Sequence, residues 1–181
     1  MRAMNVDVFR LEFDVVGNQE KPEGNPIPYQ RSTQRGSWNK QVTRYHYWRD
    51  HIKRAFLEAI IDTYLVSGGS INVGGVGTVA CFDLPTGLRP IKVLLNPVDV
   101  DIRCNIVITA RYAVDRKDGL KASNHADGDN ILKGVIDALF MDDKAVRVGG
   151  FRTEYGEAGN VRVSILMKKE RPRASHEELP A

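Results

Sequence analysis

Between residues 127 and 143, several aspartates surround a single lysine in the sequence. Two of them lie four residues before and four residues after the lysine, and another two are adjacent to each other. The stretch reads Asp-Gly-Asp-Asn-Ile-Leu-Lys-Gly-Val-Ile-Asp-Ala-Leu-Phe-Met-Asp-Asp. Oxygen ligands at this density are typical of Mg²⁺ or Mn²⁺ sites, whereas zinc sites normally recruit histidine or cysteine. Carboxylates that hold such an ion beside an ammonium group have the chemistry of a metal-dependent phosphodiesterase.

The apolar residues of this stretch predict the helix that must carry these side chains. They recur at helical spacing and form one buried arc: Ile131, Leu132, Val135, Ile136, Leu139 and Phe140. We expect Asp129 at the N-cap, with Asp127 in the loop that enters the helix. Four-residue steps from Asp129 reach Lys133 and Asp137, so these three side chains share one polar stripe. Asp142 and Asp143 follow the helix and precede a predicted strand.

An ordinary structural interpretation also accounts for part of this pattern. An aspartate N-cap followed by a solvated polar face is common, and Lys133 could simply pair with Asp129 on an exposed surface. Such an i,i+4 pair contributes on the order of 0.3 kcal/mol. A calcium-binding EF-hand is excluded because Ile131, Leu132 and Ala138 occupy positions that need an oxygen ligand, a glycine and a glutamate.

The run Asp-x-Asp-Asn-x-x-Lys, followed by Asp-Ala-Leu and then Asp-Asp, resembles the signature of the RusA family of Holliday junction resolvases. The resemblance covers roughly residues 127–167, and a Pro-rich, basic run from residue 24 is weakly similar to the family's opening. It implies that Asp127, Asp129 and Asp143 bind metal and that Lys133 is the catalytic cation. Asn130 and Asp137 match motif positions. The connection that leads to Asp143 is shorter than in the family, so Asp142 remains an alternative ligand.

The resemblance implies a Mg²⁺-dependent, structure-selective endodeoxyribonuclease, with Mn²⁺ as a possible substitute. Its substrate would be branched DNA such as the four-way junction, cut to leave 5′-phosphate and 3′-hydroxyl ends, and the enzyme would be a homodimer. One alternative is a DNA-binding or recombination-accessory module that keeps the acidic loop for structure without turnover. Another is a generic nuclease that acts on flaps or single strands.

Length and composition bound the remaining possibilities. With 181 residues, of which 42% are hydrophobic and 27% charged, the chain has enough apolar content for one core. We expect one domain over residues 1–170, with an insertion around 67–95, and a mobile tail over 171–181. No apolar stretch is long enough to cross a membrane and no signal-peptide pattern is visible, so a cytoplasmic protein is expected. Cys81 and Cys104 are expected to be buried, reduced thiols.

Basic and aromatic residues alternate between residues 29 and 54, where they could contact phosphates and bases. We expect Arg31, Arg35, Lys40 and Arg44 to face DNA. Several of the aromatic residues recur at helical spacing, which predicts a helix over 42–65 with Trp48 in the core.

The other elements predict an α+β domain in which a mixed β-sheet packs against helices, as in RusA. Alternating apolar and polar residues predict an opening strand over 6–16 and another within 98–114. Residues 146–155 and 161–167 alternate on either side of Gly156-Glu-Ala-Gly-Asn, which predicts a β-hairpin. The glycines between residues 68 and 77 favour a flexible hairpin or loop over a phosphate-binding loop.

Overall fold

Two helices and seven strands make up the described part of the chain. The computed structural model describes residues 8–18, 20–30, 40–63, 70–73, 76–81, 93–97, 102–114, 127–140 and 142–169. In chain order the elements are β1 (Val8–Val16), α1 (Lys40–Thr63), β2 (Ser70–Val73), β3 (Gly77–Cys81), β4 (Val93–Pro97), β5 (Ile102–Ala113), α2 (Gly128–Leu139), a 3₁₀ turn (Asp143–Ala145), β6 (Val146–Gly156) and β7 (Asn160–Lys169). Arg31, Arg35 and the predicted tail lie outside these residues.

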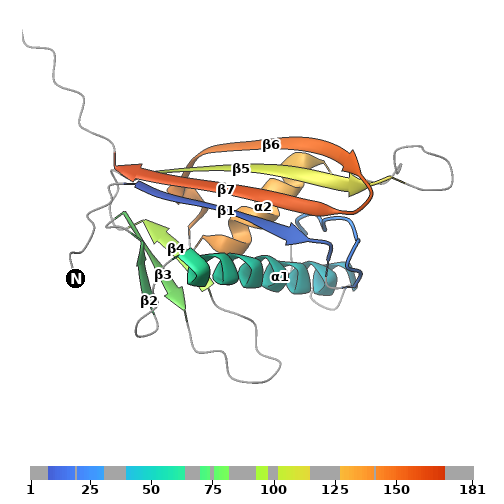
Figure 1. The fold of residues 1–181 in the computed structure, drawn as a ribbon, viewed down its shortest axis with the longest axis horizontal. Helices are drawn as coiled ribbons and strands as arrows, with labels where there is room; N and C mark the ends of the chain where they lie inside the picture. Colours follow the sequence, from blue (N-terminus) through green and yellow to red (C-terminus); the bar gives the residue numbers. More distant parts are fainter. Residues whose placement is uncertain are drawn as a thin grey trace, which may run out of the picture.

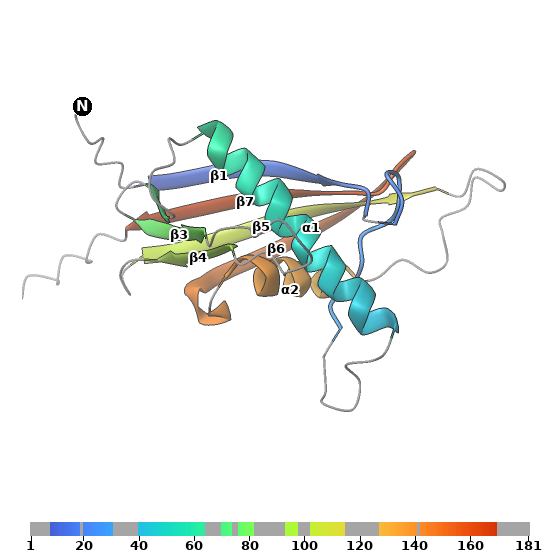
Figure 2. The same cartoon turned by 90° about the horizontal axis from the view of Figure 1, so that it is seen from below.

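The main sheet has four strands in the order β1-β7-β5-β6. The pairs β1–β7 and β7–β5 are antiparallel, whereas β5 and β6 run parallel, so the sheet is mixed. Both helices lie against the same face of this sheet, as the two views in Figures 1 and 2 show. The predicted α+β class, with a mixed sheet packed against helices, is therefore confirmed.

The predicted hairpin between β6 and β7 is wrong. Both strands exist with nearly the expected bounds, but β5 lies between them and hydrogen-bonds to each. The alternation in β7 buries Val161, Val163, Ile165 and Met167, which suits a strand paired on both sides. β6 carries Gly149 and Gly150 and is largely exposed, which suits an edge strand. A short turn sequence cannot distinguish adjacent strands from strands that straddle a third.

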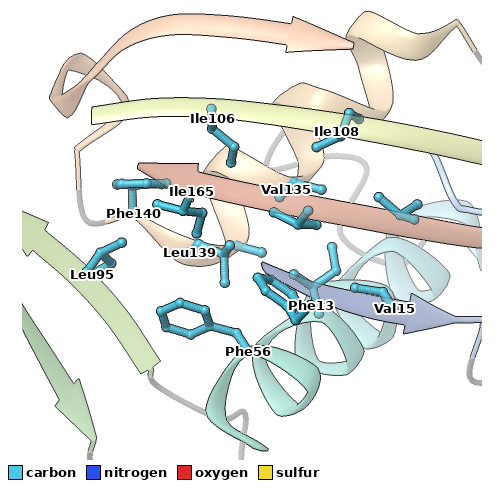
Figure 3. Packing of buried hydrophobic residues seen from close by; sticks show 14 of the residues in the cluster. Phe13, Val15, Phe56, Leu95, Ile106, Ile108, Val135, Leu139, Phe140 and Ile165 are labelled. Atoms are coloured by element: carbon cyan, nitrogen blue, oxygen red, sulfur yellow. The ribbon is translucent and has the colours of Figure 1, made fainter. Parts of the chain in front are cut away.

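The core lies between the helices and the inward faces of the strands. β1 alternates strictly, with Phe9, Leu11, Phe13 and Val15 buried and the residues between them exposed. Figure 3 shows Phe56 of α1 beside Phe13; their ring centroids are 5.7 Å apart. α1 confirms the predicted helix to within two residues at each end, and Trp48 is fully buried as expected.

Residues of the predicted insertion form a second, three-stranded antiparallel sheet in the order β2-β3-β4. β2 and β3 are joined as a hairpin, in agreement with the glycine pattern. Leu95 of β4 is fully buried and forms a parallel bridge with Phe140, immediately after α2. This small sheet therefore packs at the end of the helix that carries the aspartate–lysine motif (Figure 3).

Cys104 is a free thiol with no exposed surface, as expected, while the side chain of Cys81 lies outside the described atoms. Neither described helix is long and apolar enough to span a bilayer.

Candidate functional site

The helix that carries the motif begins two residues earlier than the sequence predicts. Asp127, not Asp129, is the N-cap: its backbone is extended, and its carbonyl accepts hydrogen bonds from the amides of Asn130 and Ile131 at 3.0 and 3.3 Å. The Asp127 carboxylate makes no capping hydrogen bond. Asp129 falls in the first turn, where the helix dipole still favours a negative charge.

Asp129 and Lys133 form the ion pair that their spacing predicts. Lys133 Nζ lies 3.2 Å from Asp129 Oδ2, and the two side chains are 60% and 49% exposed. At that exposure the pair contributes only a few tenths of a kcal/mol, roughly 0.3, to stability. The ammonium group therefore remains accessible from solvent.

The end of α2 sets the position of the second acidic pair. The chain becomes extended at Phe140, which is anchored by its bridge to Leu95. Asp142 then caps the 3₁₀ turn, because its Oδ1 accepts a hydrogen bond from the Lys144 amide at 3.0 Å. Asp142 and Asp143 are both exposed at the start of β6.

A cavity of about 800 Å³ lies beside α2, and most of the polar residues of the motif line it. Its polar lining comes from Asn130, Lys133, Asp137, Asp142 and Asp143, with Tyr29 from the segment that precedes α1. The structure thus brings Lys133 and Asp143 to one cavity.

The other two predicted ligands lie outside the lining of this cavity. Asp129 borders it through its ion pair with Lys133. Asp127 instead lies near the end of β5, where its charge adds to the effect of burial and of Tyr155 in raising the pKa of the Tyr112 hydroxyl to about 12.

The predicted metal ligands do not converge on one point. Within the described part of the chain, no three carboxylate, imidazole or thiol side chains lie close enough together to hold a metal ion. The donor type is nevertheless the one that Mg²⁺ prefers, since every acidic group on the cavity offers oxygen. The described residues on this cavity therefore do not form a complete cation cage by themselves.

Asp137 is fixed by contacts that the sequence pattern did not reveal. The Tyr45 hydroxyl donates a hydrogen bond to its Oδ2 at 2.7 Å, and Arg49 Nη2 donates to its backbone carbonyl at 3.1 Å. Arg49 Nε lies 3.2 Å from Oδ2 as an ion pair, although this atom makes no hydrogen bond within the described structure. Both partners come from α1, so one wall of the cavity is tied to the other helix.

Two of the predicted DNA-contacting residues are described. Lys40 is exposed at the start of α1. Arg44 is held by Glu20, with its Nε and Nη2 donating to the two carboxylate oxygens at 2.7 and 2.9 Å. These residues line a separate cavity of about 530 Å³. Arg44 is therefore already paired with an acid in this structure.

Comparison with protein-family models finds no match for this chain, and comparison with curated proteins finds none either. Assignment of a function therefore rests on the residues and geometry above.

Proposed function

We propose that this protein is a RusA-like, Mg²⁺-dependent endodeoxyribonuclease that cuts branched DNA, leaving 5′-phosphate and 3′-hydroxyl ends. The observation that supports this most directly is the cavity beside α2, which Lys133 shares with Asp142 and Asp143. A solvent-accessible cation and a pair of carboxylates on one cavity suit a phosphodiester, whose charge must be neutralised while water is directed at phosphorus.

The residues have separate roles in this proposal. Lys133 contacts the scissile phosphate as a cation and stabilises the added charge of the pentavalent transition state. Asp143, with Asp142 beside it, provides the carboxylates that face the phosphate. Asp129 orients Lys133 through their ion pair. Asp137, anchored by Tyr45, keeps this part of α2 in place.

The ion and the DNA would bind together. Mg²⁺ is commonly held by one or two carboxylates plus substrate phosphates rather than by an all-protein cage. Such an arrangement agrees with the absence of a three-ligand cluster in the described residues. When bound, the ion would supply charge neutralisation and a more acidic water.

We propose that the active form is a homodimer. A four-way junction has two-fold symmetry, and a two-fold dimer can place one active site on each of two opposed strands. A single subunit could make only one nick at a time.

The direct test is cleavage of a synthetic four-way junction with and without Mg²⁺. Lys133→Ala and Asp143→Asn should each lower the cleavage rate by at least about 100-fold, in line with loss of a transition-state charge partner. Lys21→Ala and Asp14→Asn make the same changes at exposed positions away from the cavity and should cleave normally. Asp127→Asn, Asp129→Asn and Asp142→Asn then show which other carboxylates are needed.

Each possible outcome separates the proposed function from its alternatives. Tight junction binding without cleavage would favour the non-catalytic DNA-binding module. Equal cleavage of junctions, flaps and single strands would favour a generic nuclease. Undiminished cleavage by both Lys133→Ala and Asp143→Asn would remove this cavity from the chemistry.

A further inference from the structure

β6 is an edge strand of the main sheet, along the top of the sheet in Figure 1. Among the described strands, only β5 is hydrogen-bonded to it. An edge strand of this length presents a row of backbone amides and carbonyls that another strand can pair with. Proteins often protect such an edge with a proline, and β6 contains none. Its outer side is therefore suited to accept a further strand.

The side chains of β6 alternate between the two faces of the sheet. Phe151 lies on the helix side, so close to Gly128 that a Cβ there would collide with its ring, and yet Phe151 is 49% exposed. Arg152 and Glu154 lie on the opposite, uncovered side, and both are exposed. The edge thus carries an aromatic ring on one face and two opposite charges on the other.

This pattern is complementary to a second copy of β6 that runs antiparallel. A two-fold axis perpendicular to the sheet keeps each residue on its own face, and residues on one face oppose each other. With the axis at Thr153, Arg152 opposes Glu154 of the partner subunit, and Phe151 opposes Tyr155 of the partner subunit. Each pair then occurs twice. Opposite charges and paired aromatic rings at opposed positions stabilise antiparallel strands.

The surrounding charges favour this register. An axis at Arg152 or at Glu154 would place like charges directly opposite each other, which is unfavourable. Glu154 also lies 3.1 Å from Arg111 of β5, so in the register centred on Thr153 its carboxylate would lie between two guanidinium groups. On β5 the register partner of Arg152 is Thr109, which carries no charge.

β1, the other edge of the main sheet, is more closely engaged with its neighbours. Asp14 is paired with Arg162 of β7 at 3.1 Å. His51 of α1 has its Nε2 atom 3.0 Å from the carbonyl oxygen of Val16. These contacts make β6 the edge that is better suited to pair with a second chain.

We propose that β6 pairs with β6 of a second copy of this chain, antiparallel and about a two-fold axis at Thr153. The choice of a second copy as partner rests on the self-complementary charges and on the homodimer of the proposed function. Two four-stranded sheets then join into one continuous sheet. Because the axis is perpendicular to the sheet, the two α2 cavities lie on the same side of it, where one branched DNA molecule can contact both.

Exchange of charges tests the register. Sedimentation measures the dimer dissociation constant of Arg152→Glu, of Glu154→Arg and of an equimolar mixture of the two. Each single variant should raise this constant at least about tenfold, because two symmetry-related pairs become repulsive. The mixture should recover most of the wild-type affinity, since its mixed dimer again opposes arginine to glutamate in both pairs.

Matched controls lie on the same face of the sheet at the other edge. Arg10→Glu and Glu12→Arg make the same changes at exposed positions of β1 and should leave the dissociation constant within about twofold of wild type. Thermal unfolding establishes that every variant is folded.

A disulfide across the axis gives a second readout. Directly opposed residues of antiparallel strands lie about 4.5 to 5.5 Å apart between their Cα atoms, a separation that a disulfide spans. Mild oxidation of Thr153→Cys should therefore yield a covalent dimer. Val148→Cys, at an exposed position of the same strand, does not oppose its own copy and should remain uncrosslinked beyond the wild-type level.

Three results would overturn the proposal: a wild-type protein that remains monomeric, single β6 variants that dimerise normally, or a mixture that fails to recover affinity. Loss of the dimer in the β1 variants alone would overturn it as well. The result is independent of cleavage. A β6-dependent dimer that never cuts DNA would support the interface and contradict the nuclease, whereas a nuclease whose dimer is unaffected by the β6 variants would do the opposite.

Discussion

The Tyr45 hydroxyl and the Asp137 carboxylate are joined by a 2.7 Å hydrogen bond between residues 92 positions apart in the sequence. Burial, followed by this hydrogen bond and the Asp137 charge, raises the pKa of Tyr45, so its hydroxyl stays a proton donor at all physiological pH values. Tyr45 also packs edge-on against Tyr29, with ring centroids 5.4 Å apart. The Tyr45 side chain thus connects α1, α2 and Tyr29, which also lines the cavity.

Replacement of Tyr45 by phenylalanine should lower the free energy of unfolding by about 1 to 2 kcal/mol. The ring still fills its place, but Asp137 loses a charge-assisted hydrogen bond in a partly buried position. Urea denaturation of both proteins measures the difference. Tyr47→Phe is the matched control on the same helix, because Tyr47 is 58% exposed and its change should stay within about 0.5 kcal/mol. Equal effects of the two substitutions would contradict a special role for the Asp137 contact.

Replacement of Lys53 by methionine should leave stability unchanged or raise it by about 1 kcal/mol at pH 7. Lys53 is only 7% exposed, and its Nζ is 3.8 Å from Oδ1 of Asp50, with which it forms an ion pair. A buried charge with so distant a partner is often replaced by an apolar chain at no cost. Lys40→Met, at an exposed position of the same helix, is the control.

The pH dependence of the Lys53 effect has a definite sign. Burial, and then the positive charge of Arg49, lowers the pKa of Lys53 below its ordinary value of 10.5. The unfolded chain therefore binds more protons than the folded one between these two pKa values, and wild-type stability gains from this group as pH rises. The advantage of Lys53→Met should shrink towards pH 10.5. If the stability advantage of Lys53→Met over wild type grew towards pH 10.5, it would contradict a lowered pKa for Lys53.

Glu20→Gln should strengthen DNA binding if Arg44 contacts the substrate, because the Glu20 carboxylate now accepts hydrogen bonds from Nε and Nη2 of the guanidinium and neutralises its charge. When Arg44 no longer pairs with an acid at position 20, it can bind a phosphate, which should raise the affinity for DNA roughly fivefold at about 0.1 M salt. Fluorescence anisotropy in EDTA measures this change. Glu58→Gln removes the same charge from an exposed position of α1 and controls for net charge. An equal gain in both variants would mean that Arg44 is not a DNA contact.

Local periodicity was sufficient to predict the helices and most strands. The apolar spacing around Val135 and Ile52 reflects burial against one face, which is a property of each segment alone. The start of α2 was misplaced because Asp127 and Asp129 are equally suitable N-caps, and the choice depends on where the incoming chain lies. The order of strands depends on long-range pairing, so the turn at Gly156 could not indicate that β5 lies between β6 and β7.

The candidate site was predictable as a set of residues but not as an arrangement. Chemistry and spacing identified Lys133 and Asp143, and both line the cavity. Tyr45 is a core aromatic by its helical spacing, and only the packing of α1 against α2 brings its hydroxyl to Asp137.

Stability should fall steeply in alkaline solution because Cys104 is buried without a charged partner to compensate its ionisation. Burial raises the pKa of Cys104 from 9.0 to about 12, and Cys104 has no exposed surface. The folded state therefore keeps its proton where the unfolded chain has lost it, so stability that is fully present below pH 9 is lost as pH rises towards 12. Each such group contributes a slope of roughly 1.4 kcal/mol per pH unit inside its window. Tyr112, whose pKa is raised from 10.0 to about 12, adds the same trend from pH 10 upward.

Cys104→Val keeps an apolar side chain on the strand, so in urea titrations its stability should begin to fall near pH 10 instead of pH 9. Identical pH profiles for the two proteins would show that another group controls alkaline unfolding.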